Sequence, residues 1–136
     1  MIAQSCSTKM LILIFLMMPK HHQRYDEHTF WEEGLLIMNH GESRASDKTL
    51  CHEFLSFFGA DPVHVHVIWI LLLKNGWLQL GGQLKPCHLL WAFYFLKVYS
   101  SFTVLAKNIG CDVKTFRERV WFFAEGIGTL DNKVVS

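Results

Sequence analysis

Basic side chains gather in one stretch of the chain, between positions 97 and 119. This stretch contains five Lys or Arg residues and two acidic ones, a local surplus of three positive charges, whereas the whole chain has a net charge of +1. Lys and Arg side chains bind DNA phosphates and the acceptor atoms of guanine. The small net charge argues against a dedicated nucleic-acid binder, and the local surplus partly answers that objection. The candidate DNA-contacting residues are Lys107, Lys114, Thr115, Arg117 and Arg119.

Cysteine and histidine residues could in principle hold a metal ion, but none of them completes a known spacing. His64 and His66 would point to opposite sides of a helix, although on a strand they would share a face. Two Cys-His dipeptides begin at positions 51 and 87, yet the four cysteines include no CxxC pair. We therefore expect reduced, mostly buried cysteines, no metal site and no cofactor.

No local signature joins a nucleophile to a base. A nucleophilic enzyme needs a Ser or Cys beside a base that a third group orients. Cys87 and Cys111 are candidate nucleophiles, but no sequence motif supplies their partners. The pair Gly81-Gly82 lacks the GK[ST] that completes a phosphate-binding loop. The sequence predicts no catalytic residue and no small-molecule substrate.

An apolar run of nine residues, from Met10 to Met18, lies near the start of the chain. A membrane-spanning helix needs about 20 apolar residues, so this run is too short. Only one Lys precedes the run, and no small-residue cleavage site follows it, so we do not expect secretion. The run is either a short core or interfacial segment or part of a poorly ordered start, and a short membrane-associated protein is a third alternative.

Helical patterns follow one another after residue 50. Residues 50–58 end at Gly59 and place four apolar side chains on one predicted face, namely Leu50, Phe54, Leu55 and Phe58. Asp61 and Pro62 are typical of a helix start, and the helix would run to about Lys74, although VHVHVIWI could instead form a strand. A third helix, residues 87–99, is apolar on nearly all sides, which predicts a central buried helix.

A helix-turn-helix pattern follows. Ser100 or Ser101 can cap a short helix over residues 102–108, and Gly110 can adopt the left-handed backbone of a tight turn. Asp112 can cap the next helix, whose apolar stripe consists of Val113, Phe116, Val120, Phe123 and Ile127. In such a motif the second helix presents its first turns to the major groove of DNA.

These patterns predict an all-α protein, a small helical bundle that ends in a helix-turn-helix-like unit. Residues 1–49 are expected to be an irregular or weakly structured segment, with one or two helical turns around Phe30 and a polar linker that begins at residue 39. Residues 50–131 would form the helical domain, with the helix-turn-helix-like unit at 101–127.

Several motifs in residues 50–131 resemble the N-terminal helical region of Harbinger-like DDE transposases and their domesticated relatives. The order of the motifs and their aromatic pairs are the specific part of the resemblance. The matching motifs are Phe58-Gly59-x-Asp61-Pro62, Pro86-x-His88-Leu89-Leu90-Trp91-Ala92, Leu96-Lys97-Val98-Tyr99, and Lys114-Thr115-Phe116-Arg117 followed by Val120-Trp121. Family members often carry an aromatic residue at the position of Arg119, where this chain departs from the pattern.

The resemblance implies a non-catalytic piece of a transposase. In that family the helical region precedes a domain similar to ribonuclease H, where two Asp and one Glu hold divalent metal ions and cut and join DNA. We expect this chain to stop before such a domain, so no catalytic carboxylate is carried over. The resemblance also implies a nuclear location and double-stranded DNA as a partner.

Other readings of the same chain remain open at this point. It could act as a partner of a full-length relative, or be a gene fragment without a selected role. It could also be a helical protein–protein interaction module that uses Trp121 and Phe122 as a docking face.

Overall fold

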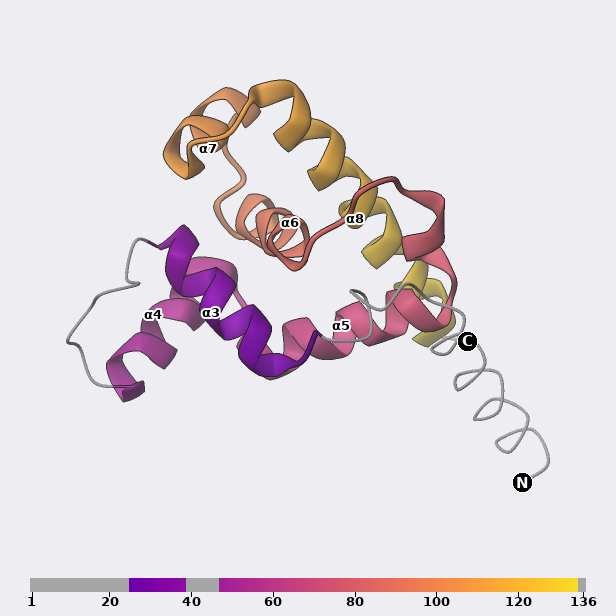
Figure 1. The fold of residues 1–136 in the computed structure, drawn as a ribbon, viewed down its shortest axis with the longest axis horizontal. Helices are drawn as coiled ribbons and strands as arrows, with labels where there is room; N and C mark the ends of the chain where they lie inside the picture. The colour runs from indigo at the N-terminus through magenta and orange to yellow at the C-terminus, as the bar shows by residue number, and fades with distance from the viewer. Residues whose placement is uncertain (1–24, 39–46, 135–136) are drawn as a thin grey trace.

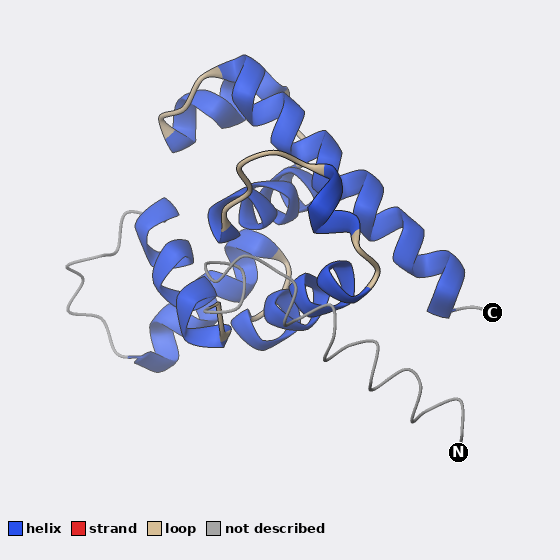
Figure 2. Ribbon diagram, turned by 45° about the vertical axis from the view of Figure 1, so that its right-hand side comes forward, coloured by secondary structure: helices blue, strands red, loops and turns tan. Residues whose placement is uncertain are grey.

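The computed structural model describes residues 25–38 and 47–134. Every element in this part of the chain is a helix, which confirms the predicted all-α fold (Figure 2). The elements are α3 (Glu27–Ile37), α4 (Asp47–Phe58), α5 (Pro62–Lys74), the short 3-10 helix η1 (Trp77–Leu80), α6 (Pro86–Val98), α7 (Phe102–Ile109) and α8 (Val113–Val134).

Helix α6 lies at the centre of the molecule, as its apolar sequence predicts. Helices α3, α4, α5 and α8 all pack against it. In Figure 1, α3, α4 and α5 lie on one side of α6, whereas α7 and the first half of α8 lie on the other. Leu89, Leu90 and Ala92 are fully buried at this junction. The helix-turn-helix-like unit is therefore held on the rest of the fold through a shared apolar centre.

Residues 62–74 form a helix and not the alternative strand. Asp61 caps α5 by accepting a hydrogen bond from the backbone N–H of His64 at 2.8 Å, and Pro62 occupies the first turn. The buried residues recur with the period of a helix and are Val65, Trp69, Leu72 and Leu73. An alternating strand would have buried Val63 and Val67 as well, but these are about half exposed.

The predicted apolar face of α4 is largely correct. Leu50, Phe54 and Phe58 are buried, and Gly59 ends the helix with a φ of 76°. Leu55 was expected on the same face but is 47 % exposed. It follows Phe54 directly, so it projects about 100° around the helix from the buried stripe.

The helical unit begins earlier in the chain than residue 50. Helix α3 spans three turns in a region predicted to be weakly structured, and its Phe30 is fully buried. Asp26 and Thr29 form a reciprocal capping box at its start. Gly34 lies against the ring of Phe54 in a space that a Cβ atom would fill. A residue without a side chain is thus needed at this position for close packing.

Two predictions fall outside the described residues, namely the apolar run of residues 10–18 and most of the polar linker that begins at residue 39. Within residues 25–38 and 47–134, no single helix has both the length and the apolar composition to cross a membrane. One pair of consecutive helices, Lys48–Phe58 and Pro62–Lys74, is long and apolar enough when the two are taken together, but the pair is bent by 49°.

Candidate nucleic-acid interface

The helix-turn-helix-like unit has the local hydrogen bonds that its sequence predicts. The hydroxyl of Ser101 accepts a hydrogen bond from the backbone N–H of Val104 at 3.3 Å and so caps α7. Gly110 has a φ of 86°, and its N–H donates to the carbonyl oxygen of Ala106 at 2.8 Å. Asp112 then accepts from the backbone N–H of Thr115 at 3.0 Å and starts α8. These bonds define the turn between the two helices.

Apolar packing fixes the angle between α7 and α8. Leu105 and Ala106 of α7 are buried, and the small side chain of Ala106 allows close approach. On α8, the predicted apolar stripe is confirmed: Phe116, Val120 and Phe123 are fully buried, while Val113 and Ile127 are partly buried. The ring of Phe116 lies 5.7 Å from that of Trp91 on α6, measured between centroids, so the unit is anchored to the central helix.

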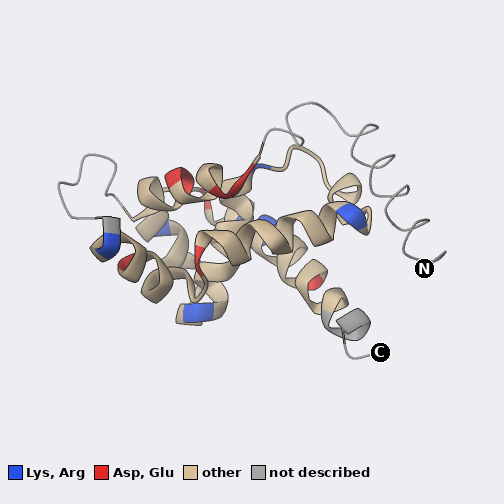
Figure 3. Ribbon diagram, turned by 90° about the horizontal axis from the view of Figure 1, so that it is seen from below, with Lys and Arg blue, Asp and Glu red and all other residues tan. Residues whose placement is uncertain are grey.

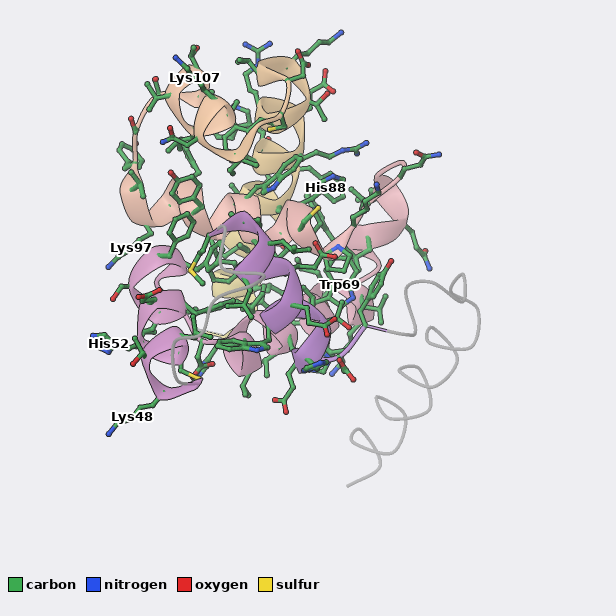
Figure 4. The ribbon with its side chains drawn as sticks, turned by 60° about the vertical axis from the view of Figure 1, so that its left-hand side comes forward. Lys48, His52, Trp69, His88, Lys97 and Lys107 are labelled. Atoms are coloured by element: carbon green, nitrogen blue, oxygen red, sulfur yellow. The ribbon has the colours of Figure 1, made fainter. Side chains whose placement is uncertain are left out.

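The opposite side of α8 carries the basic residues. Lys114 and Arg117 are exposed and lie one turn apart on the outward face, with the acidic Glu118 beside them. Lys107 is exposed in the last turn of α7 and points away from the protein in Figure 4. In the part of the chain that the structure describes, none of these three cations forms an ion pair. Their charges are therefore available to an external anion.

Thr115 occupies the first turn of α8 and is exposed, as expected for a DNA contact. Its hydroxyl, however, already donates a hydrogen bond to the capping carboxylate of Asp112 at 3.3 Å. Thr115 therefore takes part in the cap at the start of α8. A DNA phosphate or base could bind the Thr115 hydroxyl only in addition to, or in place of, Asp112.

Arg119 does not share the exposed face of Lys114 and Arg117. Two residues along a helix correspond to a rotation of about 200°, and Arg119 is only partly exposed. Its charge acts instead on His88 of α6, a side chain that is 7 % exposed. Burial, together with the positive charges of Arg119 and Lys85, lowers the pKa of His88 to about 4. Arg119 thus belongs to the junction of α6 and α8, unlike the other four candidates.

His88 itself has a structural role at the start of α6. Its Nδ1 accepts a hydrogen bond from the backbone N–H of Lys85 at 3.1 Å. The imidazole ring also packs against Trp91, with ring centroids 4.6 Å apart. Figure 4 shows His88 inside the molecule, whereas Lys48 and His52 point outward from α4. The neutral ring is therefore the form that fits this site.

The neighbouring rings of Trp121 and Phe122 face different parts of the molecule. Trp121 is 48 % exposed and contacts Phe102 at the start of α7, with ring centroids 6.1 Å apart. Phe122 is partly buried and packs against Trp77 at 5.4 Å. The two residues therefore do not form one continuous docking face. Trp121 instead lies close to the outward face of Lys114, a placement that composition alone does not indicate.

Charge is distributed unevenly along the sequence. Positions 25–61 contain eight acidic and two basic residues, whereas positions 62–130 contain seven basic and three acidic ones. Helix α3 contributes Glu27, Glu32 and Glu33 to the acidic half, and Figure 3 shows acidic positions along it. The net charge of +1 therefore hides a basic half that includes the helix-turn-helix-like unit. An uneven charge distribution of this kind lets a local surface attract an anion even when the net charge is small.

The Cys and His residues outside this unit do not come together. His64 is exposed and pairs with Asp61 at 2.7 Å, whereas His66 lies near the ring of Phe30. Within the described ranges, no three His, Cys, Asp or Glu side chains gather in a group that could hold a metal ion. The three described cysteines are free thiols, but Cys51 is exposed, in contrast to the predicted burial.

The remaining thiols are poorly suited to nucleophilic attack. Burial raises the pKa of Cys87 to about 11, and burial also raises the pKa of Cys111. Because the thiolate is the nucleophilic form, both groups are held in their unreactive state near neutral pH.

Comparisons of the chain with protein-family models, with curated proteins and with solved structures find no match. The resemblance to Harbinger-like transposases therefore stays a prediction from the motifs quoted above.

Proposed function

We propose that this chain is a non-catalytic, transposase-derived helical protein that binds double-stranded DNA through the first turns of α8. The observation that carries the proposal is the outward face of α8, where Lys114 and Arg117 are exposed and unpaired directly after the turn. The opposite face of the same helix is fully occupied by the core.

The two helices of the unit would contact different parts of the DNA. Helix α8 would lie in the major groove, where Lys114 and Arg117 can reach base edges or phosphates. Helix α7 would cross the backbone, with Lys107 available to a phosphate. Because α8 packs against both α7 and α6, its cations project from a helix whose other face is held in the core.

Salt dependence of binding tests this proposal. Fluorescence anisotropy of a labelled random-sequence duplex would be followed across a salt series. Three phosphate-neutralising cations predict a slope of about −2.7 in log K against log salt, or a loss of about 40-fold between 50 and 200 mM. Binding that is undetectable at low salt, or insensitive to salt, would exclude the proposal.

A protein–protein interaction module is the second candidate, and one observation favours it. The end of α6 exposes apolar side chains, namely Leu96, Val98 and Tyr99, and the last of these is 79 % exposed. Exposed apolar side chains gathered at one end of a helix can mark an interaction site. Light scattering coupled to size-exclusion chromatography would support this candidate through concentration-dependent association, and a monomer at all concentrations would count against self-association.

A further inference from the structure

Trp121 lies on the same side of α8 as the exposed cations. Residues seven positions apart differ by only about 20° around a helix, so Lys114 and Trp121 are nearly aligned, with Arg117 between them. The indole is about 10 Å further along the helix axis than Lys114, a distance of about three base pairs. Trp121 is 48 % exposed, whereas Val120 and Phe123 in the same turn face the core and are fully buried. The outward face of α8 therefore consists of two cations followed by an aromatic ring.

Contacts with α7 hold this ring in place. Phe102 meets Trp121 with ring centroids 6.1 Å apart and planes inclined by 56°. Phe102 in turn stacks on Phe95 of α6 at 4.8 Å with an interplanar angle of 13°. One side of the indole is thus supported by the fold, and the other is open to solvent. A supported ring loses little conformational freedom when a ligand covers its open side.

We infer that Trp121 is a base-reading residue that makes apolar contact with the 5-methyl groups of thymine in the major groove, an inference that rests on the proposed DNA-binding function. Lys and Arg match the phosphates and the acceptors of guanine. An aromatic hydrocarbon surface on the same face can be buried by an apolar partner, and among the base edges of the major groove that partner is the thymine methyl group. This contact distinguishes A·T from G·C pairs at the third turn of α8.

Two duplexes that differ only in that methyl group test the inference. Alternating A·T and alternating A·U duplexes would be titrated with the full chain in the same buffer. Burial of one methyl group is worth about a fourfold difference, so we expect the wild type to bind the thymine duplex about fourfold more tightly. Trp121→Phe should keep the preference because it retains an apolar ring. Trp121→Ala should bind the two duplexes equally.

The ratio of the affinities for the two duplexes shows whether Trp121 contacts the thymine methyl group or only stabilises the fold. A loss of folded protein lowers both affinities by the same factor and leaves their ratio unchanged. Leu80→Ala is the matched control, since Leu80 is an apolar side chain that is 72 % exposed on η1, and it should keep the fourfold ratio. Equal binding of both duplexes by the wild type, or an unchanged ratio in Trp121→Ala, would overturn the inference while leaving DNA binding intact. Failure to bind either duplex would overturn the proposed function as well.

Discussion

The indole Nε1 of Trp77 donates a hydrogen bond to the backbone carbonyl oxygen of Phe122 at 3.0 Å, across 45 residues of sequence. The bond joins η1 to the middle of α8. Close by, Gly126 lies under the same indole, so that an added Cβ would be 2.5 Å from Nε1 of Trp77. The second half of α8 is therefore fitted to the body of the fold, while the first half carries the exposed cations.

Substitution of the two glycines of α8 should have opposite effects on stability. Gly126→Ala places a methyl group against Trp77 and should lower the free energy of unfolding by about 1–3 kcal/mol. Gly128→Ala meets no atom within 4 Å and should raise it by up to about 1 kcal/mol, because alanine favours the helix. Urea denaturation of the two variants measures both effects. Equal stability changes would show that the close contact at Trp77 does not restrict position 126.

The buried His88 predicts that stability falls in mild acid. Its pKa is lowered to about 4 in the folded chain from an ordinary value of 6.5, so between these values the unfolded chain binds more protons. Stability should therefore rise with pH across this window, and proton uptake by the unfolded chain should lower the free energy of unfolding by up to about 3 kcal/mol as the pH falls from 6.5 to 4.

Urea unfolding at pH 7 and pH 4.5 would measure this dependence. His88→Gln removes the titrating group and should flatten the curve in that window, whereas the same change at the exposed His52 serves as the control. A pH dependence in His88→Gln as steep as in the wild type would show that other groups cause it.

Tyr99 ends α6 in a left-handed backbone conformation that is unusual for a residue with a side chain. Its φ is 53°, and its ring is 79 % exposed while leaning on Phe95 at 5.6 Å. Tyr99→Gly removes the strain of the left-handed backbone but also removes the ring contact with Phe95. Tyr99→Ala removes the same contact and leaves the backbone strain in place. We expect the glycine variant to be more stable than the alanine variant by about 1 kcal/mol. Thermal unfolding compares them, and an alanine variant of equal or greater stability would contradict the assigned strain.

The sequence was most informative where structure depends on neighbouring residues. The caps at Asp61 and Asp112 and the turn at Gly110 are local features that residue type and position predicted, and Ser101 is one of the two serines predicted to cap α7. The stripe of α8 was predicted for the same reason, because a helical period places its residues on one face.

Features that depend on distant packing were not predicted. Helix α3 joins the core because Gly34 fits against Phe54, twenty residues away in the sequence, and no local signal marks that contact. Arg119 was grouped with Lys114 and Arg117 by charge, but helical phase turns it toward His88. Helical phase alone also places Trp121 on the outward face. Its exposure, however, depends on how α7 packs.

Reversal of charge at Lys114 and Arg117 tests the central claim most directly. The double variant Lys114→Glu, Arg117→Glu would be compared with Lys48→Glu, Lys85→Glu, which changes the net charge equally at exposed lysines on α4 and before α6. Affinity for a random-sequence duplex at 50 mM salt is the measurement. We predict a loss of more than about tenfold for the first pair and a much smaller loss for the second, because phosphate contacts are local to the α8 face. Equal losses in the two variants would contradict a DNA-binding face at the start of α8.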